Sequence, residues 1–174
     1  MNTSTETRPA SSAPYALTPK RAAILLWALV PVLGLLVRAI VSMTAPAMEA
    51  LGSDLGLVHI VATVAWAVFM AITEGYQGFQ RSFSPRVVHR AFALAASPRP
   101  VDVVFAPIYA IGYYRAPKRT MVVAWSVTTG VVGLIFAVHQ IEQPWRGLID
   151  VGVVVGLAWG MASLVALAVR RLVR

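Results

Sequence analysis

The chain contains no cysteine, which excludes disulfide bonds, thiolate metal sites and cysteine catalysis. Charged residues are also scarce: they make up 13% of the 174 residues, whereas a soluble domain carries about a quarter. The sequence has no Gly-rich phosphate loop, no His-Glu-x-x-His zinc motif and no nucleophile elbow, so it carries no enzyme signature. It also has no internal repeat, which leaves an inverted-repeat transporter without support.

Apolar residues dominate instead, at 58% of the chain, with a mean hydropathy of +0.72. They form long runs at about residues 22–43, 57–78, 121–141 and 147–169, each long enough as a helix to cross the ~30 Å apolar core of a bilayer. We therefore predict an all-α integral membrane bundle of four transmembrane helices. Residues 1–19 are predicted to be a disordered cytoplasmic tail, and residues 20–174 a single membrane domain.

The basic residues are distributed with a strong bias among the segments between these runs. Most of them precede the first run, lie between the second and third runs, or follow the fourth, and only two lie elsewhere. The positive-inside rule then makes both termini and the central loop at residues 79–120 cytoplasmic. A high proportion of Arg and Ala suggests a GC-rich bacterial genome, so we expect a multi-pass protein of the inner membrane. This topology explains the net charge of +8, and we expect no nucleic-acid partner.

Two alternative topologies are open at this stage. The first run could be a signal peptide with a cleavage site at Ala45-Pro46-Ala47, although Arg38 interrupts its apolar segment. Residues 101–114 could form a fifth span, although as a helix they would extend only about 21 Å. We predict instead an interfacial or re-entrant helix for residues 101–114. A fifth span would move basic residues to the outer side of the membrane.

The central loop has a second helical pattern at residues 86–96. Val87, Val88, Ala91, Phe92 and Ala95 share one helical face, which predicts an amphipathic helix on the membrane surface. Most of the loop's positive charge serves to orient the chain. The same charge favours anionic lipid, and the surface could also receive a protein partner.

Small residues recur every four positions in the fourth apolar run, at Gly152, Gly156 and Gly160. Such spacing lets another membrane helix approach closely, and helix packing is what drives association in lipid. Ala67, Ala71 and Gly75 form a similar stripe in the second run. One interpretation is packing within the bundle; the other is that the Gly152 series contacts a partner subunit or a second copy of the chain.

Five polar residues are predicted near the outer ends of the spans, and we call them the outer cluster: Arg38, His59, His139, Glu142 and Asp150. His139 and Glu142 are three residues apart, so a continuous helix would place them on one face. One interpretation is a purely structural ion-pair network in which Arg38 pairs with Asp150 or Glu142. The alternatives are a small-molecule or proton site and, with the weak candidates His59, His139 and Glu142, a divalent metal or b-type haem site. No cofactor is predicted outright.

A second group, the inner candidate, is predicted near the inner end of the second span. It comprises Glu74, Tyr76, Gln77, Gln80 and Arg81. Charges within a span are expensive, at about 2.5–3.5 kcal/mol on insertion scales, so Glu74 either pairs with Arg81 or a loop arginine, or binds a cation or proton.

The function expected from these features is a non-enzymatic accessory or assembly subunit of a membrane complex. Small size, the glycine stripe and the absence of catalytic motifs support that expectation. An oligomeric transporter or channel component using Glu74 or the outer cluster is the first alternative. A haem- or metal-binding membrane redox protein is the second.

Overall fold

The computed structural model describes residues 17–173, and within them every regular element is helical. The main helices are α1 (Pro19–Leu51), α2 (Leu57–Met70), α3 (Ser84–Ala96), α6 (Lys118–Val138) and α7 (Trp145–Val173), with the π-helix η1 (Ala71–Phe83) between α2 and α3 and two short helices, α4 (Pro100–Val104) and α5 (Ala106–Ile111). Four helices are long and apolar enough to cross a membrane. The prediction of an all-α, four-helix membrane protein is confirmed. Most of the predicted cytoplasmic tail lies outside the described residues.

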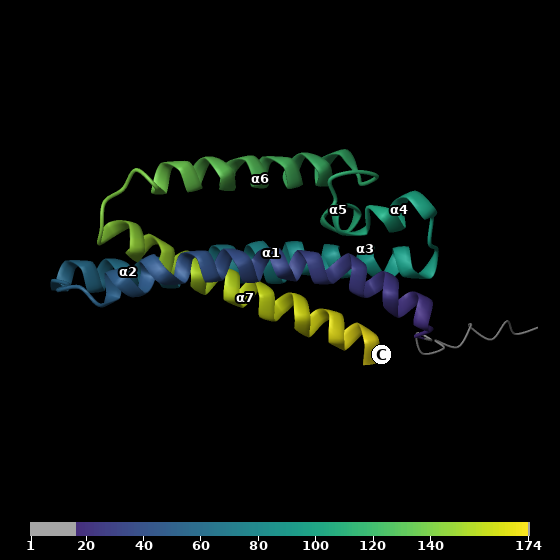
Figure 1. Cartoon of the computed structure of the whole chain (residues 1–174), viewed down its shortest axis with the longest axis horizontal. Coiled ribbons are helices and arrows are strands. Elements are labelled where there is room, and N and C mark those ends of the chain that lie inside the picture. The colour runs from purple at the N-terminus through teal and green to yellow at the C-terminus, as the bar shows by residue number, and fades with distance from the viewer. Residues whose placement is uncertain (1–16, 174) are drawn as a thin grey trace, which may run out of the picture.

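The helices α1, α6 and α7 and the combined helix Leu57–Ala96 run alternately in opposite directions along the long axis (Figure 1). One end of the molecule carries Lys20 and Arg21 at the start of α1 and Arg170 and Arg171 near the end of α7. We call it the basic end, and we call the opposite end, which holds the α1–α2 and α6–α7 connections, the far end.

The second span is much longer than the sequence suggested. α2, η1 and α3 form one helix, Leu57–Ala96, so residues 79–96 continue the span and are not a separate loop. The apolar face predicted for a membrane-surface helix is buried within the protein: Val87 and Ala91 are 0% exposed and Phe92 is 3% exposed. That prediction failed because an amphipathic pattern shows that one face is covered, without showing whether protein or lipid covers it.

The apolar core lies in the half of the molecule nearer the basic end. Ile24, Leu25, Ala28 and Val32 of α1 pack with the buried face of α3, with Ala106 and Ala110 of α5, and with Leu164 of α7. α4 and α5 are five and six residues long, far too short to span a bilayer of about 30 Å. Residues 101–114 are therefore not a fifth span, and α5 packs against α1 and α3.

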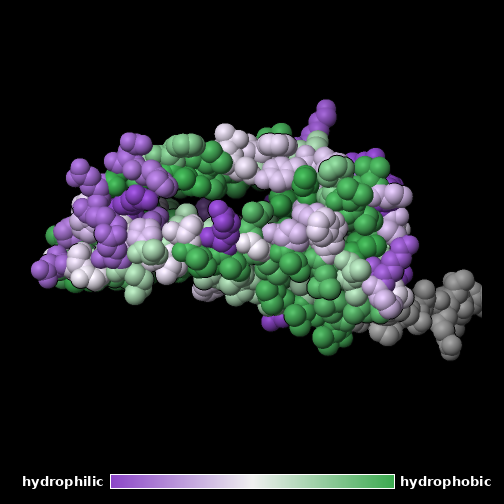
Figure 2. Space-filling model, viewed as in Figure 1, coloured by the Kyte–Doolittle hydropathy of each residue, from purple (hydrophilic) through white to green (hydrophobic). Residues whose placement is uncertain are grey.

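α6 stands apart from the other long helices. Ala124 is its only buried residue, and α6 packs closely against none of the other described helices. The space-filling view shows a hollow between α6 and the rest of the bundle (Figure 2). Val131, Val132 and Ile135 lie on the same side of α6 as Ala124, and their side chains are 48%, 47% and 39% exposed. The side of α6 that should contact the bundle is therefore largely uncovered.

Candidate functional site

The glycines of α7 form the seam between this helix and the second span. A Cβ atom added at Gly152 would overlap the Trp66 indole, and one added at Gly160 would overlap the Phe79 ring. At Gly156 the added Cβ would lie 3.0 Å from the Cβ of Glu74. The stripe is therefore occupied within the chain. This contact is the packing within the bundle that one of the two interpretations expects.

Gly75, the last residue of the similar stripe in the second span, meets α7 in the same seam. Gly75 is buried, and a Cβ added there would lie 2.9 Å from the Cβ of Trp159. The indole nitrogen of Trp159 donates a hydrogen bond to Oε1 of Gln80 at 2.8 Å, and that of Trp66 donates to the backbone oxygen of Ile149 at 3.0 Å. Two tryptophans thus fix the height of α7 relative to the second span.

This register places Glu74 at the middle of the span and not near its inner end, as the sequence suggested. Its Cβ is level with Gly156, which lies about 17 Å from Trp145 and about 21 Å from Arg170 at 1.5 Å per residue. Glu74 is therefore level with the middle of α7, one of the helices long and apolar enough to cross a membrane. Because π-helical turns are rare and frequent at functional sites, the 13-residue π-helix makes this the leading candidate site.

The inner candidate residues all lie on η1 and all are exposed, but they do not form the ion pair expected for them. Arg81 lies over the ring of Tyr76, with its guanidinium carbon 5.7 Å from the ring centroid. Among residues 17–173, no hydrogen bond or salt bridge joins Glu74 to another side chain. Gly78 has no side chain to cover Oε2 of Glu74, which would lie 3.9 Å from a Cβ added at Gly78. The Glu74 carboxylate is thus exposed and level with the middle of α7, and lipid tails could not solvate a charge at the middle of a membrane-spanning helix.

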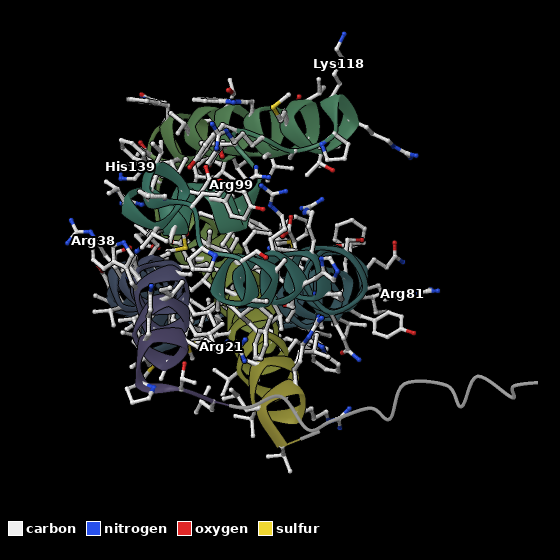
Figure 3. The ribbon with its side chains drawn as sticks, turned by 90° about the vertical axis from the view of Figure 1, so that its right-hand side faces the viewer. Arg21, Arg38, Arg81, Arg99, Lys118 and His139 are labelled. Atoms are coloured by element: carbon white, nitrogen blue, oxygen red, sulfur yellow. The ribbon has the colours of Figure 1, made fainter. Side chains whose placement is uncertain are left out.

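Arg38 also lies deeper than predicted. Gly147 of α7 contacts Pro46 and Ala50 of α1, and Gly156 is about 14 Å further along α7. Because α1 runs antiparallel to α7, the same distance of about 14 Å from Pro46 and Ala50 towards the start of α1 reaches Arg38. Arg38 is therefore level with Glu74 and exposed, and in the described part of the chain it makes no salt bridge with Asp150 or Glu142. Viewed from the basic end, Arg38 and Arg81 lie on opposite sides of the bundle (Figure 3).

The remaining members of the outer cluster lie near the far end but do not form one network. His139 and the buried Asp150 are within electrostatic reach of each other and of Arg146. The His59 ring lies against Trp145, with centroids 4.8 Å apart. α6 ends at Val138, so Glu142 is outside the helix and does not share a helical face with His139. The predicted shared face is wrong because the span ends three residues early.

The described residues contain no group of three or more His, Asp or Glu side chains placed to hold a metal ion. The ring nitrogen Nδ1 of His139 is 2.7 Å from the backbone oxygen of Ile135, one turn earlier in α6. The weak metal candidates His59, His139 and Glu142 are therefore not assembled into a common ligand set.

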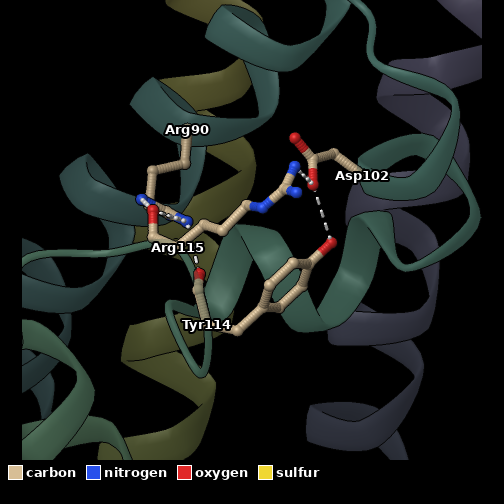
Figure 4. Close-up of polar contacts among 4 residues, drawn as sticks. All are labelled: Arg90, Asp102, Tyr114 and Arg115. Carbon is tan, nitrogen blue, oxygen red and sulfur yellow. Dashed lines mark hydrogen bonds and ion pairs between the residues drawn. The ribbon is translucent and has the colours of Figure 1, made fainter.

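A polar cluster that the sequence did not reveal lies near the basic end (Figure 4). Asp102 is 2% exposed. It forms a 2.7 Å ion pair with Arg115 and accepts a 3.2 Å hydrogen bond from the Tyr114 hydroxyl. Arg90 donates to the backbone oxygens of Tyr109, Tyr114 and Arg115 at 2.7–3.3 Å. Asp102 is the lone acidic residue between Glu74 and Glu142. The isolated position of Asp102 among basic residues was the sequence feature that could have revealed this cluster.

This cluster holds the connection from which α6 departs. Arg115 adopts a left-handed backbone with φ 49°, which costs about 1–3 kcal/mol for a non-glycine residue and is offset by the ion pair. The Tyr113 hydroxyl is hydrogen-bonded to Thr128 of α6. Burial, the hydrogen bond to Asp102 and its negative charge raise the pKa of Tyr114 above its ordinary value. The cluster therefore acts as an anchor that ties the start of α6 to α3 and α4.

Four helices long and apolar enough to cross a membrane define a multi-pass membrane protein, and the polar side chains of η1 lie within one of these helices. No protein-family model, curated protein or solved structure matches the chain.

Proposed function

We propose that the protein is a small, non-enzymatic accessory or assembly subunit of a complex in the bacterial inner membrane, with both termini in the cytoplasm. The orientation is supported by the gathering of Lys20, Arg21, Arg170 and Arg171 at one end, because basic residues accumulate on the cytoplasmic side. The many arginines at that end also favour contact with anionic lipid.

The observation that carries this proposal is α6, a helix long and apolar enough to cross a membrane that packs closely against no other helix in the described part of the chain. Ala124 and Thr128 mark the side of α6 that faces the bundle, and Ser126, Gly130, Gly133 and Ala137 lie on the opposite side at helical spacing. A Cβ added at Gly130 or Gly133 has no neighbour within 4 Å. Because membrane helices associate through such small-residue faces, we propose that this face packs on an apolar membrane helix of another protein.

The test is purification of the full chain in mild detergent from its native membrane, followed by mass spectrometry of stoichiometric companions. A variant with Gly130→Leu and Gly133→Leu should lose the companion while keeping its fold, because no described residue occupies that space. Val131→Leu, on the bundle-facing side of the same helix, is the matched control and should retain the companion. A clean monomer from the unaltered chain, or equal retention by both variants, would overturn the proposal.

A second candidate function, an oligomeric transporter or channel component, is favoured by one observation. Glu74 and Arg38 are exposed charges at mid-membrane depth, and such residues commonly mark ion or substrate pathways. Loss of transport on Glu74→Gln, with membrane insertion and assembly unchanged, would support this candidate over the first.

A further inference from the structure

The two exposed charges at mid-membrane depth have opposite signs and lie on different helices. Glu74 is level with Gly156 of α7, and the Gly147 contact with Pro46 and Ala50 makes Arg38 level with Gly156 as well. Neither side chain takes part in a hydrogen bond or salt bridge in the described part of the chain. Lipid tails offer no group that could satisfy either charge at this depth.

These two groups do not pair with each other within the described part of one copy. Arg38 lies on α1 and Glu74 on η1, and α7 packs extensively on both of these elements. Arg38 and Arg81 of η1 lie on opposite sides of the bundle (Figure 3). Copies in one membrane share one orientation, so corresponding residues of neighbouring copies remain at equal depth. Arg38 of one copy can therefore meet Glu74 of a neighbouring copy at the same depth.

We propose that the chain forms head-to-tail homo-oligomers in which Arg38 of one copy pairs with Glu74 of its neighbour. One contact then satisfies both charges. The symmetric alternative, in which η1 meets η1, would place Glu74 against Glu74, and an α1–α1 contact would place Arg38 against Arg38. Both bring like charges together at mid-membrane. A head-to-tail contact repeated by rotation about the membrane normal closes into a ring.

The chemistry of the site favours a basic side chain over a bound metal ion as the partner of Glu74. A divalent cation requires several oxygen ligands, whereas Glu74 belongs to no group of three or more His, Asp or Glu side chains that could hold a metal ion among the described residues. A guanidinium needs only one carboxylate and matches its geometry. Gly78 leaves the approach to Oε2 of Glu74 free of a side chain. This inference does not depend on the accessory-subunit proposal, which concerns α6.

The absence of native cysteine allows a direct test. Two differently tagged full-length chains, one carrying Arg38→Cys and the other Glu74→Cys, are co-expressed and treated in membranes with a short bis-maleimide. The linker is needed because a disulfide requires Cα atoms within about 7 Å, and an arginine–glutamate pair holds its backbones further apart. The expected product is a dimer containing both tags. Val37→Cys replaces Arg38→Cys in the matched control and should give much less of it.

Charge reversal provides the second arm and does not use cysteine. Glu74→Arg alone should abolish the oligomer seen by native mass spectrometry, and the double variant Arg38→Glu with Glu74→Arg should restore it. Restoration is a readout that a misfolded variant cannot produce. The proposal is overturned if 38–38 or 74–74 products predominate, if the Val37 control cross-links equally well, or if no mixed product forms. It is also overturned if charge reversal leaves the oligomer intact. If a companion protein bound to α6 were lost, none of these readouts would change.

Discussion

α7 and α6 look alike in sequence, yet the structure uses them differently. Both are apolar helices with glycines at intervals of three or four residues. In α7, a Cβ at Gly152, Gly156 or Gly160 would meet a side chain of the second span, whereas Gly130 and Gly133 of α6 have nothing within 4 Å. Small-residue spacing therefore predicts that a helix can be approached closely. It does not predict whether the approaching helix belongs to the same chain.

The largest effect is expected where the α7 seam is broken. Gly152→Leu should destabilise the protein by about 3 kcal/mol, because overpacking a close contact costs about that much, and Trp66 is held in place by its bond to Ile149. Chemical denaturation in detergent measures the change. Gly130→Leu on α6 is the control and should not destabilise the isolated chain, because the added side chain meets no neighbour and leucine is a better helix former than glycine. Equal losses for the two variants would contradict the comparison.

The next effect concerns the anchor that connects α6 to the bundle. Asp102→Asn removes the ion pair with Arg115 and should cost about 1–3 kcal/mol, as expected when a buried partner of polar groups is lost. Hydrogen exchange should accelerate at residues 97–120 and much less in α7. Glu142→Gln, which alters an exposed carboxylate at the far end, should leave this pattern unchanged. Unaltered exchange at residues 97–120 would show that the anchor does not hold α6.

A smaller effect is expected at alkaline pH. Because the pKa of Tyr114 is raised in the folded state above its ordinary value of about 10, its contribution to stability is complete below that value and is lost as pH rises towards the folded pKa. Ultraviolet titration of tyrosinate, compared between the unaltered chain and Tyr114→Phe, isolates this group. The missing signal should belong to a late-titrating tyrosine. A signal that titrates at or below the ordinary value would contradict the burial of Tyr114 beside Asp102.

The smallest effect has the opposite sign. Gly133→Ala on α6 should raise the stability of the isolated chain by up to about 1 kcal/mol, since alanine is the better helix former and the added methyl group meets no neighbour. Thermal unfolding in detergent is the measurement. A loss of stability would mean that the outward face of α6 is already packed, in which case α6 and α7 would not differ.

The sequence was sufficient to predict the class of fold, because long apolar runs have few alternatives to transmembrane helices. It also located the η1 polar group, although at the wrong depth. Apolar length alone placed the end of the second span at residue 78, while the helix continues to Ala96. The depth depends on the Gly156–Glu74 and Trp159–Gln80 contacts, which join residues about eighty positions apart and leave no local pattern. The Asp102 anchor joins residues only 12 and 13 positions apart, but the turn that brings them together follows no helical period, so it was missed as well.

The depth of η1 is the claim on which the account of Glu74 and Arg38 depends, and the cysteine-free chain allows it to be measured by spin labelling. Single cysteines replace Gln77 on η1, Val37 beside Arg38, and Ser97 after α3, and the labelled chains are reconstituted in bilayers. The labels at 77 and 37 should be equally accessible to oxygen and shielded from a polar nickel reagent, unlike the label at 97. If the label at 77 reacts to the nickel reagent as the label at 97 does, η1 lies at the membrane surface and the account is wrong.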